Sequence, residues 1–509
     1  MGNDSRTKNV VRNSIFALIT QVINLIISFV VRTIFINTLG TEYLGVNGLF
    51  TNILTILSFA ELGIGNAIIF SMYKPAAEDN KEKIKSLMKL YKNAYRTIAI
   101  VVLVAGLLVI PFLKYIITDV PNITENITAI YILFLLNTAI SYTYTYKRSI
   151  ISVYQQDYIL SIFDFVFNIL KNVLQSIILI CYKNYMAYLC IQIVCTFVEN
   201  VIISIRVNKK YPFLKEEKVK ELDKEEKKNI FTNVRSLVVY KFGNVILDGT
   251  DNIIISSTIS TAVVGLVSNY TLIINAVKGI LGKITNAVTS SIGNLNAMND
   301  NTKKEEVLYD YLFVAFWIYG LSSIGMGILF NDFIEIWIGK EYILSIYTVI
   351  ALVLSFFVDG MHYPAYTYRV TMGLFKEGKK APFFTAIINV ILSIIMGNIM
   401  GVTGVFLATS ISRLLTTTWY DPYLIFKKRL NLSAKKFVVR YVQYFIIFVV
   451  VGIISYFTIN LIGVSGILGF LIKGIIAFIE INLLFLVCFF KRREFKNTID
   501  RLKIMIKEK

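Results

Sequence analysis

Ionisable and amide side chains recur at helical spacing inside segments of this sequence that are otherwise apolar. Steps of three and four residues place the members of each set on one face of a helix. A charge at the centre of a bilayer costs about 3 kcal/mol, so seven helices with such faces predict a shared polar interior. The sets are Gln21, Asn24, Ser28 and Arg32; Asn52, Thr55, Ser58 and Glu61; Asp164, Asn168, Lys171 and Gln175; Lys241, Asn244, Asp248 and Asp251; Asn275, Lys278 and Asn286; Asp359, His362, Tyr366 and Arg369; and Ser410, Arg413 and Thr417.

Five basic residues on these faces would suit an anionic ligand. Lysine and arginine supply several charged hydrogen-bond donors, which match the oxygens of phosphate and pyrophosphate. By position along its segment, Arg32 lies toward the outer end, and the other four lie near mid-membrane. We predict a pyrophosphate and sugar cavity formed by Arg32, Lys171, Lys241, Lys278, Arg413, Asn24, Asn244 and Asn275.

An alternative interpretation is that such cations only balance acids within the membrane. Lys171 would then pair with Asp164, and Lys241 with Asp248, because a buried charge needs a partner. Arg369 is a separate case. It stands at the inner end of its segment, so we expect its long side chain to extend to the membrane surface.

Four acidic residues, Glu61, Asp248, Asp251 and Asp359, have two open roles. They would either bind H+ or Na+ as a coupling ion, as intramembrane carboxylates do in transporters, or balance neighbouring lysines and arginines. We expect no metal site and no cofactor, since the single histidine, His362, cannot by itself form a histidine-based metal site.

The composition places these faces in a membrane protein. Hydrophobic residues make up 56% of the 509, the mean hydropathy is +0.64, and charged residues are 17%, against about 25% in soluble proteins. This excludes an ordinary soluble enzyme and a disordered chain. Fourteen apolar runs are long enough to cross a bilayer: 10–36, 46–72, 94–118, 127–149, 158–181, 184–206, 231–257, 262–295, 307–330, 343–368, 382–401, 403–426, 437–461 and 466–490. The predicted fold class is an all-α polytopic membrane protein with about fourteen transmembrane helices.

The loops between these runs differ in charge from one side to the other. Loops on the side opposite the N-terminus carry only Lys183 and Lys340. Segments on the side of the N-terminus include Lys81, Lys83, Lys85, Lys89, Lys209, Lys210, Lys376, Lys379, Lys380, Lys427, Lys428, Arg429, Lys491, Arg492 and Arg493. Positive charge marks the cytoplasmic side, so both termini are predicted to be cytoplasmic. The net charge of +19 then reflects topology, and no nucleic-acid partner is expected.

An internal repeat at an offset of 220 residues pairs the first two spans with the seventh and eighth. The matched residues are Asn24 with Asn244, Thr38 with Thr258, Thr41 with Thr261, Gly45 with Gly265 and Thr51 with Thr271. Both copies start from the cytoplasm, so the repeat is parallel, which is typical of transporters. The predicted domains are two six-helix lobes in pseudo-two-fold relation (1–210 and 231–430), a cytoplasmic linker (211–230), two further helices (431–490) and a basic cytoplasmic tail (491–509). We expect the tail to lie on the inner membrane surface as a solvated amphipathic segment.

Two stretches resemble the flippases of bacterial polysaccharide biosynthesis, which move O-antigen and capsule repeat units. Residues 35–74 contain a Leu-Gly-x-x-x-x-Gly turn followed by Glu-Leu-Gly-Ile-Gly, and residues 373–428 read GLFKEGKKAPFFTAIINVILSIIMG, then GVTGVFLATSISRLLTT and WYDPYLIFKK. The family belongs to the multidrug/oligosaccharidyl-lipid/polysaccharide exporter (MOP) superfamily. The resemblance implies a MATE-like fold with two six-helix bundles around a V-shaped cavity and two extra helices.

The resemblance also implies a function. Family members move undecaprenyl-pyrophosphate-linked oligosaccharides from the inner to the outer leaflet of the bacterial plasma membrane. We expect alternating access driven by an ion gradient or the membrane potential, in a monomer that contacts membrane lipid, with a polysaccharide polymerase and assembly proteins as partners. Related lipid II flippases use cavity arginines in spans 1, 2 and 8. Here Arg32 and Lys278 match, but span 2 has no cation, which argues against lipid II as substrate.

Two alternatives belong to other classes of protein. A multidrug antiporter on the same fold would favour an acidic, aromatic cavity for cationic drugs, and the cationic faces count against it. A membrane polysaccharide polymerase or glycosyltransferase usually needs a large outer loop with catalytic side chains, and the outer loops here are short. A transporter rather than an enzyme is therefore predicted.

Overall fold

The structure, a computed structural model, describes residues 3–58, 61–119, 121–215, 219–297, 300–378 and 380–507, and the regular elements within these ranges are all helical. The α-helices are α1 (Asn3–Leu39), α2 (Thr41–Leu57), α3 (Glu61–Ala77), α4 (Lys81–Val109), α5 (Leu113–Ile116), α6 (Ile127–Ser141), α7 (Thr145–Val153), α8 (Asp157–Tyr182), α9 (Tyr185–Lys210), α10 (Lys224–Thr258), α11 (Thr261–Ala297), α12 (Asn301–Trp337), α13 (Ile346–Thr371), α14 (Phe375–Gly378), α15 (Lys380–Met400), α16 (Val402–Leu415), α17 (Thr417–Ile425), α18 (Lys435–Asn460), α19 (Gly466–Phe489) and α20 (Arg493–Lys507). The predicted all-α class is confirmed.

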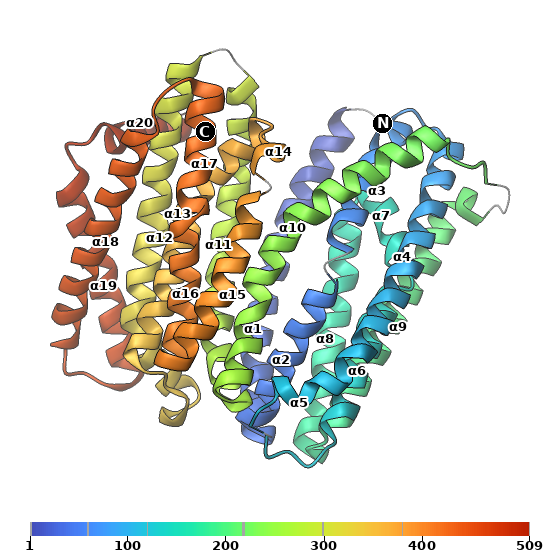
Figure 1. Ribbon diagram of the computed structural model, residues 1–509, viewed down its shortest axis with the longest axis horizontal. Coiled ribbons are helices and arrows are strands. Elements are labelled where there is room, and N and C mark those ends of the chain that lie inside the picture. Colours follow the sequence, from blue (N-terminus) through green and yellow to red (C-terminus); the bar gives the residue numbers. More distant parts are fainter. Residues whose placement is uncertain are drawn as a thin grey trace. The chain divides into compact units, whose positions relative to one another are not determined.

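The chain forms two compact units, Met1–Gly265 and Leu266–Lys509. In the first unit, α8 packs against α1 and α9, α9 packs against α6, and α4 packs against α3 and α6. Helix α10 packs against α2 and α3 and so belongs mainly to this unit (Figure 1). The predicted division into lobes at 1–210 and 231–430 is a statement about symmetry and stays a prediction.

In the second unit, α13 packs between α12 and α16, and α15 packs against α16. Helices α18 and α19 pack against α12 and against each other, at the edge of this unit (Figure 1). Aromatic rings fill this contact: Phe316 lies 4.9 Å from Tyr444 and 4.9 Å from Phe485, measured between ring centroids. Such ring pairs add to the stabilisation that comes from burial alone, and they fix the two C-terminal helices to α12.

The helices are long and apolar enough for a multi-pass membrane protein. Ten described helices could each cross a bilayer, and the bent pair α6 and α7 would make an eleventh. The other three predicted spans also fall on helices: 46–72 on α2 and α3, 231–257 on α10, and 403–426 on α16 and α17. Those three are interrupted or carry several charges, so the count of fourteen stays a prediction.

Two glycines of the internal repeat make reciprocal contacts within the first unit. A Cβ atom added to Gly45 of α2 would collide with the carbonyl oxygen of Thr261, and one added to Gly265 of α11 would collide with that of Thr41. Only glycine permits so close an approach of two backbones. Both glycines and both threonines are related by the same 220-residue offset, which is the relation that a parallel repeat requires.

The basic tail departs from the expected solvated segment. Helix α20 is tied to α12 by an ion pair between Arg501 Nη2 and Asp310 Oδ2 at 2.7 Å, and Asn497 donates to Glu306 at 2.8 Å. Glu494 pairs with Arg440 of α18 at 2.9 Å. The expectation missed the acids on α12 that α20 can reach, so the helix is bound to protein along one face.

Candidate functional site

A single carboxylate joins two of the predicted cations in the second unit. Asp359 of α13 accepts from Lys278 Nζ of α11 at 2.8 Å through Oδ2, and from Arg413 Nη1 of α16 through Oδ1. The packing of α13 against α16 brings Asp359 and Arg413 together. We call Lys278, Asp359 and Arg413 the cation trio. Its formal charge is +1, since one acid balances two bases.

The two basic side chains of the trio are partly accessible. The Lys278 side chain is 37% exposed, and that of Arg413 is 13% exposed. A phosphate group approaching from the Lys278 side would therefore meet a net positive charge in a low-dielectric setting, where such contacts are strong.

The alternative interpretation, in which Asp164 balances Lys171, is not supported. Asp164 of α8 pairs instead with Arg148 of α7, and Arg148 also contacts Glu199 of α9 at 3.0 Å. Arg148 reaches Asp164 because α7 packs against α8 and α9. Arg148 was not selected from the sequence, although Ser141, Thr145 and Arg148 follow one another at helical spacing in the fourth predicted span. That spacing was the available signal.

Asparagines link the first helix to the eighth. Asn168 Nδ2 donates to Asn24 Oδ1 at 2.9 Å, and Asn172 Nδ2 donates to Asn168 Oδ1 at 3.1 Å. Two of the polar faces predicted from spacing, on α1 and α8, are therefore in direct contact. Lys171 is half-buried on the same helix as Asn168.

The remaining predicted residues are distributed over several helices. Arg32 of α1 and Asp251 of α10 are half-buried, and Asn275 of α11 is exposed. Helix α10 carries Lys241, Asn244 and Asp248, whose side chains lie outside the described part of the structure. The alternative pairing of Lys241 with Asp248 therefore stays a prediction.

Arg369 does not extend to the membrane surface, which corrects the expectation. Its side chain is 1% exposed, and its Nε lies 3.0 Å from Asp421 Oδ2, which is also 1% exposed. His362 Nε2 lies 2.9 Å from the same oxygen, and the guanidinium stands over the Tyr366 ring at 5.4 Å. Asp421 lies on α17, four residues after Thr417, so it continues the helical spacing of that polar set, although it was not selected from the sequence.

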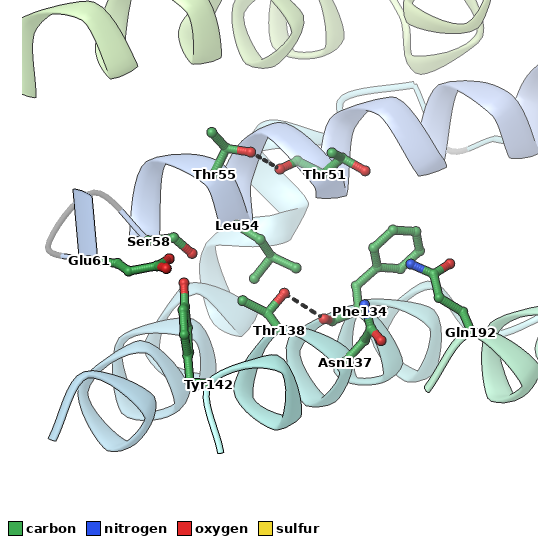
Figure 2. A pocket seen from close by; sticks show the side chains of 10 residues that line it. All are labelled: Thr51, Leu54, Thr55, Ser58, Glu61, Phe134, Asn137, Thr138, Tyr142 and Gln192. Atoms are coloured by element: carbon green, nitrogen blue, oxygen red, sulfur yellow. Dashed lines mark hydrogen bonds between the residues drawn. The ribbon is translucent and has the colours of Figure 1, made fainter. Parts of the chain in front are cut away.

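A cavity of about 380 Å³ opens among helices of the first unit (Figure 2). Its lining residues are Thr51, Leu54, Thr55, Ser58, Glu61, Phe134, Asn137, Thr138, Tyr142 and Gln192. Glu61 Oε1 accepts from Tyr95 at 3.1 Å, and the Tyr142 hydroxyl points toward Glu61 (Figure 2). Glu61 is the one residue of the predicted site among those that line this cavity.

Comparison with known proteins bears on the family and the fold. The family model described as polysaccharide biosynthesis protein matches residues 10–290. No curated protein sequence matches the chain. Among solved structures, the lipid II flippase MurJ in an inward closed conformation matches with a TM-score of 0.65 and 16% identity over 94% of this chain and 100% of that one.

Two multidrug transporters also match. An inward-facing MATE transporter of the MOP superfamily has a TM-score of 0.61 and 15% identity, covering 83% of this chain and 99% of that one. The Vibrio cholerae MATE transporter VcmN has a TM-score of 0.55 and 13% identity, covering 84% and 98%. These matches confirm the predicted MATE-like fold. Because this family model matches more than half of its length, the chain belongs to the polysaccharide biosynthesis protein family.

Proposed function

We propose that this protein is a flippase that moves undecaprenyl-pyrophosphate-linked oligosaccharides from the inner to the outer leaflet of a bacterial plasma membrane. The family and the fold support a transporter of lipid-linked substrates. The observation that carries the proposal is the cation trio, because basic side chains from α11 and α16 share one acid on α13. Such a site is costly in a membrane, and a pyrophosphate would offset the remaining positive charge.

In the proposed mechanism, Lys278 and Arg413 bind the pyrophosphate, and its oxygens compete with Asp359 for the same donors. The polyprenyl chain stays in lipid, while the sugars and phosphates follow a polar path through the protein. Alternating access then exposes this path to one side and next to the other. A charged headgroup crossing hydrocarbon alone would lose its hydrogen bonds with water, and the polar path replaces them.

The energy source in this proposal is an ion gradient or the membrane potential. Glu61, Asp251 and Asp359 are the candidates with described side chains for binding H+ or Na+. The distribution of basic loops supports cytoplasmic termini in this proposal. A polysaccharide polymerase and assembly proteins would take the substrate on the outer side.

Reconstitution tests the proposal. Proteoliposomes receive pyrophosphate-linked lipid oligosaccharides extracted from producing cells, and the fraction of sugar accessible from outside is followed over time. We expect Lys278→Met and Arg413→Met to slow transport at least tenfold, since a hydrogen bond to a charged group contributes about 1.5–3 kcal/mol. Lys278→Arg keeps the charge and should retain most of the rate.

Lys340→Met is the matched control, because this lysine is 82% exposed and lies outside the membrane helices. It should transport at the parental rate. Movement of cationic drugs without any movement of lipid-linked sugar would contradict the proposal and favour a multidrug antiporter. Normal transport by both Met variants would remove the trio from the binding site.

A further inference from the structure

The cavity of the first unit differs chemically from the cation trio. Eight of its ten lining residues have polar side chains, and the lining contains a carboxylate but no lysine or arginine among the described residues. Glu61, Ser58 and Tyr142 lie at one end, and Gln192 lies at the other (Figure 2). A phosphate would meet the negative charge of Glu61 without a compensating base, so this cavity is unsuited to the pyrophosphate.

The hydroxyl groups of the cavity act mainly as acceptors. Thr51, Thr55 and Thr138 each donate their proton to a backbone carbonyl of their own helix, at 2.7, 2.8 and 3.0 Å. Their oxygen lone pairs remain available to a ligand. Together with the Glu61 carboxylate, these three hydroxyl oxygens are hydrogen-bond acceptors in the lining, which favours a ligand rich in O–H and N–H donors.

An unsatisfied amide supports the same conclusion. The Oδ1 atom of Asn137 is buried and has no hydrogen-bond partner among the described residues. A buried acceptor left unpaired costs about 1–3 kcal/mol, and a ligand donor in the cavity would remove that cost. Asn137 and Thr138 are adjacent on α6 and both line the cavity (Figure 2).

We propose that this cavity is a glycan subsite, which takes one or two sugar units of the transported lipid through their hydroxyl and amide donors. The inference rests on the proposed flippase function. Phe134 and Tyr142 supply aromatic surface in the same lining, which suits the apolar faces of sugar rings. The volume of about 380 Å³ lies at the lower end of small-molecule sites and exceeds what a bare coupling ion would fill.

Binding to two probes tests the subsite on full-length protein in detergent. The probes are undecaprenyl pyrophosphate and the pyrophosphate-linked lipid oligosaccharides of producing cells, which differ only in the sugars. We expect the parental protein to prefer the glycan-bearing probe. The double variant Asn137→Leu/Thr138→Val should lose at least tenfold of that preference and bind undecaprenyl pyrophosphate as before, whereas Lys278→Met should weaken both probes.

Controls and contrary outcomes separate the two proposals. Asn398→Leu and Thr97→Val change the same residue types at exposed helical positions and should leave both affinities unchanged. If the double variant fails to fold, Gln192→Leu at the other end of the cavity serves in its place.

The contrary outcomes distinguish the two proposals. If the parental protein binds neither probe, the flippase proposal is overturned. Binding of both probes with equal affinity by the parental protein, or an unchanged glycan preference in the cavity variants, overturns the subsite alone.

A further outcome would reassign Glu61. If Glu61→Gln and the double variant keep the glycan preference but abolish dependence of transport on Na+ or pH, the cavity serves a coupling ion and the glycan subsite is overturned. Loss of glycan preference with ion dependence intact supports the subsite.

Discussion

Asp421 is the carboxylate on which two basic side chains of α13 converge. Its Oδ2 lies 3.0 Å from Arg369 Nε and 2.9 Å from His362 Nε2. Arg369 and Asp421 are both shielded from solvent and lipid. Breaking one partner of such a buried pair leaves an uncompensated charge, which costs far more than the pair itself contributes. The pair therefore joins α13, the helix that also carries Asp359 of the cation trio, to α17.

We expect Asp421→Asn to lower the free energy of unfolding by about 3–5 kcal/mol, measured by thermal unfolding of purified protein in detergent. The double variant Arg369→Met/Asp421→Leu removes both charges and should recover much of the loss. Glu335→Gln is the control, since its pair with Lys340 is exposed and exposed pairs contribute about 0–1 kcal/mol. Equal melting temperatures for Asp421→Asn and the control would contradict a stabilising role.

Helical spacing in the sequence selected the three residues of the cation trio individually but did not predict that they meet. Periodicity assigns a side chain to a helix face, and it selected Lys278, Asp359 and Arg413 correctly as polar positions on apolar helices. Periodicity does not give the neighbouring helix, so the meeting of two cations on Asp359 could not be predicted. Asp421 and Arg148 were not selected, although Asp421 stands four residues after Thr417 and Arg148 three residues after Thr145, so spacing alone could have included both.

At the scale of elements, α20 shows how a basic tail can be ordered by protein contacts. Arg501 and Asn497 both contact Asp310 of α12, whose side chain is buried. The interaction is charge-assisted, and such bonds contribute more than neutral ones. Sequence alone gave the amphipathic character of the tail but could not distinguish a membrane surface from the end of α12 as its partner.

We expect Asp310→Asn to loosen α20, because the carboxylate that Arg501 contacts becomes neutral. Hydrogen–deuterium exchange of the α20 backbone amides should rise several-fold, while that of α18 stays unchanged. Lys503→Gln is the matched control, since its contact with Asp500 is exposed and lies within the same helix at 3.8 Å. Unchanged exchange in Asp310→Asn would show that other contacts hold α20 in place.

Two breaks in predicted spans belong to the same scale. The run 46–72 reads as one span in the sequence, but α2 ends at Leu57 and α3 begins at Glu61. The run 403–426 likewise divides into α16 and α17 at Thr416. Hydropathy averaged over a whole span does not resolve these ends, because each run remains apolar overall despite the polar residues near the ends. The first break lies at the residues that close one end of the cavity, Ser58 and Glu61.

For the whole molecule, the class followed from the sequence because apolar runs of about 20 residues are typical of membrane helices. The family followed from the resemblance carried by residues 35–74 and 373–428. The 220-residue repeat was visible as a few matched residues, and Gly45 and Gly265 were among them. Their contact with the opposite copy could be seen only in three dimensions, since matched spacing does not reveal which surfaces touch.

We expect Gly45→Ala and Gly265→Ala each to destabilise the protein by about 1–3 kcal/mol, the usual cost of forcing bulk into a packed contact, and to slow transport. Gly325→Ala is the control, because a Cβ there meets nothing within 4 Å and alanine favours a helix. Thermal unfolding and liposome transport would be measured on all three. Parental behaviour of the two repeat variants would mean that the helices separate at no cost.

The reciprocal glycine contacts have a mechanical consequence. Gly45 meets the backbone of Thr261, and Gly265 meets that of Thr41, so both contacts depend on one separation between the beginnings of α2 and α11. Bulk added on either side widens the clearance for both. The two backbone contacts at this helix crossing are therefore coupled, and a substitution at either glycine changes the distance between α2 and α11 at both contacts.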